Sequence, residues 1–325
     1  MSPTNPRDSH TESSSTPLLT FILGCTGCGK GSLGRELAKR TGGEIISIDS
    51  MKVYRRMDVG TAKPSAAQRA EFRYHLIDVV EPSEEFSVGC YVELAERAIA
   101  DIHGRGRPIF IVGGTPMYIK ALGEGLFDGP PADAAIRERL RDEAVATGNT
   151  PLHDRLRRVD PSAADRIHVN DLRRIVRALE VFELTGTPLT EFQTQWDGRL
   201  RDRCVFFGLR RERADQNQRC NTRVRRMVDG GLVDEAKSLL AESEPLSETA
   251  RKAVGYAEIF EYLAVGGSLA ETIEKIKINT RRLAKSQRTW FKRFRQTEWI
   301  DLAADADMAD VAYDLINRRG ALWSA

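Results

Sequence analysis

The chain has 325 residues, of which 41% are apolar, and its 49 Lys and Arg residues against 47 Asp and Glu residues give a formal net charge of +2. This length allows about two domains with a full-sized hydrophobic core. The near balance of charge excludes a uniformly basic nucleic-acid coat and an acidic solvating chain, although a balanced total can conceal charges that are segregated along the chain.

The first segment, residues 1–16, is rich in Ser, Thr and Pro and lacks the apolar stretch of a signal peptide. It therefore predicts a disordered tail on a cytoplasmic protein. No apolar run reaches the roughly 18 residues that a membrane-spanning helix needs, so we expect no membrane partner. The five cysteines are an odd number in a long chain, which argues against a disulfide framework.

Alternating strands and helices follow the tail. An apolar run at 17–24 predicts a strand, which leads through a Gly-rich turn into a helix. Further strands are expected at 44–49, 75–80 and 108–114, with a helix at 88–102 and another that begins at Thr115. This alternation is typical of an α/β fold, in which helices cover a mostly parallel sheet on both faces. Together with the phosphate-binding motif described below, it predicts a P-loop NTPase-like fold.

The strand pattern stops in the middle of the chain. Between residues 128 and 199 we find amphipathic helices with Arg on their polar faces, which predicts a helical insertion domain. A strand returns at 204–210, and helices then run to a short strand near 298–301. We therefore expect three parts, which are a tail at 1–16, a core domain made of 17–127 and 200–325, and the insertion at 128–199.

A phosphate-binding motif follows the first strand. Residues 24–30, GCTGCGK, fit G-x-x-x-x-G-K between a predicted strand and a helix, the context typical of nucleotide- and ATP-binding loops. In such a loop, backbone N–H groups cradle a diphosphate, which Lys30 neutralises. Gly31 stands where the motif needs Ser or Thr to hold Mg²⁺, and Ser32 lies one residue further round the helix. Water and substrate oxygens would then have to hold the ion.

Two cysteines within this loop, Cys25 and Cys28, form a lone C-x-x-C pair. With no second pair and no nearby His, the spacing does not indicate a zinc site. A redox pair remains an open alternative.

Two further segments point to the same edge of the sheet. Asp49 and Ser50 come at the carboxyl end of the 44–49 strand, where strands of such sheets face the ligand. Asp49 could act as a general base or position a metal ion, or it could cap the following turn. At the end of the 108–114 strand, Thr115 adds a hydroxyl to the crevice or serves as a helix N-cap.

A basic segment occurs late in the chain. Residues 275–295 contain nine Lys or Arg and no acid. Helical spacing places the cations Lys277, Arg281, Lys285, Arg288, Lys292 and Arg295 on one face, and gathers Ile276, Leu283, Trp290 and Phe294 on another that we expect to pack against the core. A solvated face would interleave acids for i,i+4 pairs, so a polyanion such as RNA is the better interpretation.

With these motifs in hand, the chain resembles the tRNA dimethylallyltransferases over about residues 18–301. The most specific stretch is DSMKVYRRMDVGTAKP, at 49–64, which is similar to the family signature D-S-x-x-x-Y-x-x-M-D-I-G-T-A-K-P. The segments HLIDVVEPSEEFSV, VGGTPMYIKAL, NDLRRIVRALEV, RKAVGY and TRRLAKSQRTWFKR also match the family in order and spacing.

The resemblance implies transfer of a dimethylallyl group from dimethylallyl diphosphate to N6 of the adenine immediately 3′ of the anticodon in tRNA, with release of diphosphate. The implied cofactor is Mg²⁺, and the implied partner is the tRNA anticodon stem-loop. We expect a monomer. The residue types found in the sequence suit this reaction, because a cationic cradle stabilises a leaving diphosphate and a carboxylate can orient an exocyclic amine.

The resemblance also assigns residues. The catalytic set is Asp49, Lys30, Thr115 and Arg223, with Asp49 as the base and Arg223 beside the leaving diphosphate. The diphosphate-binding set is Gly24, Cys25, Thr26, Gly27, Cys28, Gly29, Lys30, Gly31 and Ser32. The tRNA-binding set is Asp49, Ser50, Met51, Lys52, Thr115, Arg137, Arg173, Arg174, Ile175, Val176, Arg177, Arg251, Gly255, Tyr256, Arg281, Lys285 and Arg288.

The chain departs from the family pattern at three positions. Gly31 replaces the usual Thr or Ser, Lys52 stands where Gln is common, and Ser286 stands where Arg is often found. Two other functions stay open. A P-loop kinase of a nucleoside or small molecule would share the phosphate loop and Asp49, and a tRNA-binding relative that has lost catalysis would be consistent with Gly31.

Overall fold

The computed structural model describes residues 16–125, 129–192 and 200–323. The chain divides into two compact units. Unit 1 is made of Met1–Ile119 and Asp202–Ala325, and unit 2 is Lys120–Arg201. The tail expected at the N-terminus, and the domain boundaries expected at 128 and 199, lie outside the described residues.

A six-stranded sheet forms the centre of unit 1, with the strand order β3-β2-β4-β1-β5-β6 and parallel pairing throughout. The predicted parallel α/β sheet is thus confirmed. Every residue of β1, β2 and β4 is buried because helices cover both faces of the sheet. The strands are β1 (Leu19–Gly24), β2 (Glu44–Ile48), β3 (Tyr74–His75), β4 (Ile109–Gly113), β5 (Cys204–Arg211) and β6 (Glu298–Leu302).

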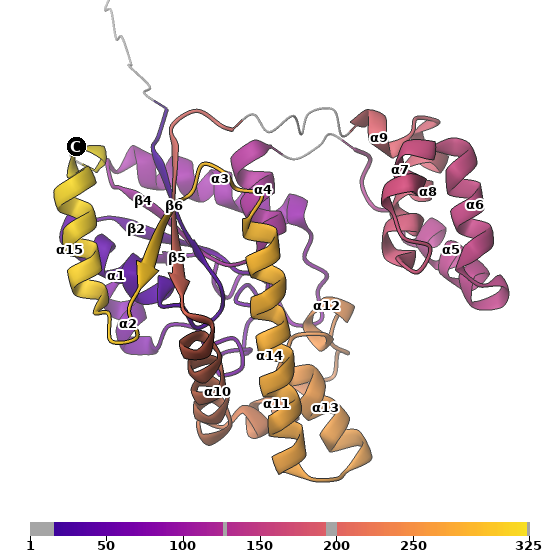
Figure 1. Cartoon of the computed structure of the whole chain (residues 1–325). Helices are drawn as coiled ribbons and strands as arrows, with labels where there is room; N and C mark the ends of the chain where they lie inside the picture. Colours follow the sequence, from indigo (N-terminus) through magenta and orange to yellow (C-terminus); the bar gives the residue numbers. More distant parts are fainter. Residues whose placement is uncertain (1–15, 126–128, 193–199, 324–325) are drawn as a thin grey trace, which may run out of the picture. The chain divides into compact units, whose positions relative to one another are not determined.

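Helices lie on both faces of this sheet (Figure 1). On one face α1 (Lys30–Thr41) packs beside α15 (Met308–Arg319), and on the other lie α3 (Val88–Gly104) and α14 (Leu269–Phe291). Helix α15 is not among the predicted elements, yet its apolar side joins the main core. The chain end closes this core, because the Trp323 indole N–H donates to the buried Thr20 hydroxyl at 2.9 Å.

Unit 1 contains further helices besides these four. Two of them, α10 and α13, pack against α14. Among the described residues, no helix is long and apolar enough to cross a membrane. The remaining elements are α2 (Ala66–Glu71), α4 (Pro116–Glu124, which continues into unit 2), α10 (Arg213–Asp229), α11 (Leu232–Leu240), α12 (Glu248–Arg251), α13 (Tyr256–Val265) and a short 3₁₀ turn at Gly320–Leu322.

The strand predicted at 75–80 is largely wrong. Only Tyr74 and His75 pair with β2. Leu76 and Asp78 have φ angles of 60° and 57°, in the left-handed region that a strand cannot accommodate. The Asp78 carboxylate explains the turn, because it forms ion pairs with Lys63 and Arg69. An apolar run therefore becomes an ion-paired loop beside the sheet.

Unit 2 is entirely helical in its described residues, as the strand-free sequence predicts. Its core is formed by apolar side chains such as Leu140, Leu156, Ile175 and Leu179. Its helices are α5 (Ala134–Thr147), α6 (Asn149–Val159), α7 (Pro161–Arg166), α8 (Leu172–Thr185) and α9 (Leu189–Phe192).

A buried carboxylate ties unit 2 together. Glu180 on α8 is fully buried. It accepts hydrogen bonds from the backbone N–H of Asp133 at 2.7 Å and from Arg177 Nη1 at 2.7 Å, and its Oε1 lies 2.8 Å from Arg137 Nε. Burial alone would raise the pKa of Glu180, but the hydrogen bonds from Arg177 and Arg137 outweigh it and lower the pKa.

We predict that Glu180→Gln destabilises unit 2 by about 1.5–3 kcal/mol at pH 7, because two partly buried guanidinium partners lose their buried counter-charge. Since the folded pKa of Glu180 is depressed, its contribution is complete above the unfolded value of about 4.3 and disappears as the pH falls through the folded pKa. Urea unfolding followed by circular dichroism should therefore show that native protein and variant converge in acid. Glu183→Gln, on the same helix but partly exposed, is the control and should cost less than about 1 kcal/mol.

Candidate active site

A cleft of about 1010 Å³ opens at the carboxyl edge of the sheet. Its floor is formed by the phosphate loop and by the segments that follow β2 and β4, and α10 and α14 contribute a wall. All of these elements belong to unit 1. The carboxyl ends of parallel strands are where α/β proteins bind their ligands, so this cleft is the candidate site.

The phosphate loop has the predicted context, directly after β1 and at the start of α1. Gly29, the N-cap of α1, has a φ angle of 106°, which a residue with a side chain would adopt only with strain. The first amides of α1 thus face the cleft without a side-chain cap. Lys30 Nζ donates to the carbonyl of Cys25 at 3.2 Å, which folds its ammonium back over the loop.

Three side chains that sequence reasoning missed hold this loop from behind. Gln287 on α14 accepts from the Thr26 N–H at 2.8 Å and donates to the Gly114 carbonyl at 2.8 Å. Gln216 on α10 donates to the Thr26 carbonyl, and Arg211 donates to the Cys28 carbonyl at 3.1 Å. Gln287 lies in the quoted TRRLAKSQRTWFKR segment, but only the folded chain shows that it joins the phosphate loop to β4.

The loop cysteines lie on the inner side of the site. Cys25, Cys28 and Cys220 are free and buried. Burial raises the pKa of the Cys25 and Cys220 thiols, which reduces the thiolate fraction that redox exchange requires. The Cys220 thiol donates to the Thr26 carbonyl at 3.6 Å, and the open redox alternative gains no support.

Asp49 and Thr115 come together at the ends of β2 and β4. Asp49 Oδ1 accepts from the N–H groups of Met51 at 3.0 Å and Lys52 at 3.4 Å, so the carboxylate does cap the following turn. Its Oδ2 makes no hydrogen bond with a described residue, and Asp49 lines the cleft. Thr115 Oγ1 accepts from the Ser50 N–H at 3.0 Å, which ties the two segments together.

Four cations line the same cleft as this carboxylate, and three of them, Lys30, Lys52 and Arg223, are predicted site residues, whereas Arg35 is not. Arg223 donates to Thr26 Oγ1 and to the Thr61 carbonyl, both at 3.3 Å. Burial lowers the pKa of Arg223. Burial and the neighbouring charges of Arg223, Lys30 and Arg35 also lower the pKa of Lys52, to about 8, despite the attraction of Asp49. The cleft is therefore strongly biased towards an anion.

The apolar side of α14 was assigned to the core, and the structure corrects this in part. Ile276 and the residues after the helix, such as Phe294, are buried. Leu283 is 40% exposed, and it lines the cleft together with Ile276 and Trp290. An apolar wall therefore faces the same cleft as the cations.

The predicted basic face of α14 also needs correction. The helix ends at Phe291, so Lys292 and Arg295 lie beyond it. Lys277 is buried and pairs with Glu274 at 2.6 Å, one residue before the acid-free stretch. Arg281 is half-buried and donates to Asn221, whereas Lys285 and Arg288 are exposed. The exposed cationic surface is narrower than the sequence suggests.

The residues of unit 2 that the resemblance assigns to tRNA have mixed surroundings. Arg137 and Arg177 bind the buried Glu180, and the side chains of Ile175 and Val176 are buried in the core of this unit. The side chains of Ile175 and Val176 therefore pack rather than face a partner. Arg173 and Arg174 are exposed on α8. Contact of this unit with tRNA stays a prediction.

A second group of assigned residues supports the signature segment. Tyr256 is buried and donates its hydroxyl to Glu235, and Glu235 also accepts from the Val59 and Gly60 N–H groups. Gly255, also buried, is the N-cap of α13, and Arg251 is exposed. Tyr256 and Gly255 thus have clear structural roles in holding the loop that ends the DSMKVYRRMDVGTAKP segment.

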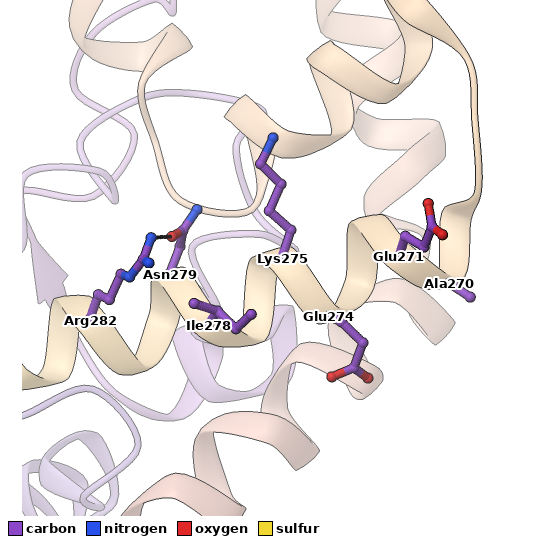
Figure 2. A pocket seen from close by; sticks show the side chains of 7 residues that line it. All are labelled: Ala270, Glu271, Glu274, Lys275, Ile278, Asn279 and Arg282. Atoms are coloured by element: carbon purple, nitrogen blue, oxygen red, sulfur yellow. Dashed lines mark hydrogen bonds between the residues drawn. The ribbon is translucent and has the colours of Figure 1, made fainter.

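A smaller hollow of about 500 Å³ lies along the first half of α14 (Figure 2). All its lining residues come from this one helix, and Arg282 donates to Asn279, one helical turn away, at 3.1 Å. Because no second element of the described chain contributes a converging group, this hollow lacks the features of a catalytic site.

The fold and the cleft together define an α/β protein of the P-loop type, whose phosphate loop opens onto a cationic cleft with one carboxylate at its centre. A family model described as IPP transferase matches residues 52–294, and one described as isopentenyl transferase matches residues 17–79. The chain belongs to the IPP transferase family.

Individual relatives cover nearly the whole chain. It is 46% identical to a tRNA dimethylallyltransferase of Geobacter metallireducens over 292 aligned residues. The alignment covers 89% of this chain and 94% of the relative. The chain is 44% identical over 286 residues to a tRNA dimethylallyltransferase of Desulforudis audaxviator, covering 88% and 92%.

Solved structures agree with this assignment. A tRNA isopentenylpyrophosphate transferase of Bacillus halodurans superposes with a TM-score of 0.69 at 39% identity, covering 95% of this chain and 97% of that one. A eukaryotic dimethylallyltransferase acting on tRNA gives a TM-score of 0.76 at 26% identity, covering 94% and 77%. The P-loop type of fold expected from the sequence is confirmed.

We predict that Gln287→Ala weakens binding of inorganic pyrophosphate about tenfold, because it releases the Thr26 N–H and the Gly114 carbonyl that shape the phosphate loop. Isothermal titration calorimetry measures this dissociation constant. Gln296→Ala, at an exposed glutamine just beyond α14, is the matched control. Equal affinities in the two variants would show that Gln287 does not shape the loop.

Proposed function

We propose that this protein transfers the dimethylallyl group of dimethylallyl diphosphate to N6 of the adenine immediately 3′ of the anticodon in tRNA. The observation that carries the proposal is the pairing of Asp49 with a phosphate loop in one cationic cleft, in a chain that belongs to the IPP transferase family. Diphosphate is the second product.

The reaction makes one bond and breaks one. The bond between the allylic carbon and the diphosphate oxygen breaks, and the adenine N6 forms the new carbon–nitrogen bond. Positive charge develops on the allylic carbon, and negative charge develops on the departing diphosphate. Lys30, Arg223 and the amides at the start of α1 lie together at the phosphate loop, which supports electrostatic stabilisation of a leaving diphosphate bound there.

The N6 proton needs an acceptor. Asp49 is the one carboxylate among the described lining residues that forms no ion pair, since Asp215 pairs with Arg211 and Arg219. Its Oδ1 is fixed by two backbone N–H groups, so Oδ2 is the oxygen left to accept the N6 proton. Thr115 holds the Ser50 backbone and thereby orients Asp49.

The rest of the cleft suits the two substrates. The apolar residues Ile276, Leu283 and Trp290 form an apolar surface suited to the prenyl group, while the cations are suited to its diphosphate. The adenine has to leave its stack to enter such a cleft. The exposed Lys285 and Arg288 lie on the same helix as the apolar wall and are suited to phosphates of the RNA backbone.

We predict that purified protein converts undermodified tRNA and labelled dimethylallyl diphosphate into prenylated adenine. Asp49→Asn should lower the turnover rate by about 10²–10⁴-fold while tRNA affinity is preserved, because Asn keeps the hydrogen-bond acceptor but cannot take the proton. Product formation is measured by mass spectrometry of digested tRNA, and tRNA binding by filter retention.

The control for this substitution is Asp234→Asn, which removes an exposed carboxylate on α11. An unchanged rate in Asp49→Asn would end its role as base. Phosphorylation of a small molecule from ATP, without prenylation, would support the kinase instead. Binding of tRNA with no turnover in the native protein would support the inactive relative.

We also predict that tRNA affinity falls steeply with salt concentration. In a plot of the logarithm of the association constant against the logarithm of the salt concentration, Arg281→Gln with Arg288→Gln should make the negative slope shallower by about 1–2. The control pair Arg97→Gln with Arg318→Gln removes two exposed arginines from α3 and α15, and should leave the slope unchanged. A flat salt profile, or equal slopes in both double variants, would remove α14 from the RNA surface.

A further inference from the structure

The expected magnesium ion meets an unfavourable set of residues at the phosphate loop. In P-loop proteins the hydroxyl that follows the lysine is a protein ligand of Mg²⁺. Gly31 supplies no oxygen at this position. The neighbouring Ser32 hydroxyl does not replace it, because it accepts a hydrogen bond from Arg35 Nη2 at 3.1 Å.

The carboxylates of the cleft do not compensate. Asp49 and Asp215 are the acidic residues among the described lining, and Asp215 is engaged by Arg211 and Arg219. Within the described part of the chain there is no cluster of three side chains suited to a metal ion. Mg²⁺ requires oxygen ligands in near-octahedral arrangement, so the residues present do not fit a magnesium ion held by the protein at this loop.

Arg35 lies beside the position from which a P-loop hydroxyl would project. It follows Gly31 by one helical turn on α1, and its guanidinium reaches back towards the start of the helix. A Cβ atom at position 31 would meet Arg35 Nη1 at 3.7 Å, so this guanidinium borders the space that a Thr or Ser side chain would occupy. Arg35 also lines the cleft.

Lys52 supplies a second positive charge, from the segment after β2 rather than from α1. It lies in the turn after β2 and lines the cleft, and its ammonium forms no hydrogen bond or ion pair with a described residue. Burial lowers the pKa of Lys52 to about 8, and the neighbouring charges of Arg223, Lys30 and Arg35 add to this against the attraction of Asp49. A cation that has mostly cationic neighbours and no hydrogen-bonded partner is stabilised when an anion enters.

We propose that Arg35 and Lys52 bind the diphosphate group directly and replace a protein-bound magnesium ion in this chain. The guanidinium of Arg35 and the ammonium of Lys52 then supply the charge that Mg²⁺ supplies beside a P-loop hydroxyl. This inference rests on the proposed function for the identity of the substrate, but it concerns only how the diphosphate is held.

Binding of inorganic pyrophosphate to the full chain, measured by isothermal titration calorimetry in EDTA and in MgCl₂, tests the proposal. The native dissociation constant should differ by less than about threefold between the two conditions. Arg35→Gln and Lys52→Gln should each weaken binding in EDTA about tenfold or more, since each removes a charge-assisted contact. The pair Lys39→Gln with Arg40→Gln, at exposed cations of the same α1, is the matched control and should bind as the native chain does.

An exchange experiment completes the test. Gly31→Thr combined with Arg35→Gln and Lys52→Gln restores the hydroxyl, for which there is space. This triple variant should bind pyrophosphate at least about tenfold more tightly in MgCl₂ than in EDTA. Native binding that collapses in EDTA, or Arg35→Gln and Lys52→Gln variants that bind as the control does, would overturn the inference and leave the proposed function intact. Absence of pyrophosphate binding under both conditions would overturn both.

Discussion

The site depends on how closely β2 and β4 approach each other at the carboxyl edge of the sheet. The Ile48 carbonyl accepts from the N–H groups of Gly114 at 3.2 Å and Thr115 at 3.3 Å, and a side chain at Gly113 would collide with that same carbonyl. This closeness brings the Thr115 hydroxyl to the Ser50 N–H and so positions Asp49. Gln287 then extends the same hydrogen-bonded assembly to the phosphate loop.

The charges that line the cleft favour binding of an anion. Lys30, Arg35, Lys52 and Arg223 line one cleft with a single unpaired carboxylate among its described residues. Gathering like charges in a partly buried space costs stability in the free protein, and an anionic ligand recovers it on binding. Because the cradle is already in place, little reorganisation is needed when charge develops on the leaving group.

The sequence predicts this site well where a signal is local, and fails where the partner is remote. The phosphate loop and Asp49 follow directly from motifs at strand ends. Gln287 has no such signal, because its importance comes from two backbone groups in segments far away in the chain. The prediction for Lys277 fails for a different reason, since its partner Glu274 is close in the chain but lies just outside the acid-free stretch. The strand expected at 75–80 is lost to left-handed residues that hydrophobic patterning cannot detect.

The two ends of unit 2 have a consequence for how the chain folds. The Arg201 N–H donates to the Gly123 carbonyl at 2.8 Å, so the chain leaves this unit beside the point where it enters. Strand β5 must pair with β1 across the whole insertion, and the entropy lost in closing a loop rises with loop length. Once the local helices of unit 2 have formed, that loop is effectively shortened to its two adjoining ends. A nascent sheet can therefore accept its fifth strand almost as if the insertion were absent.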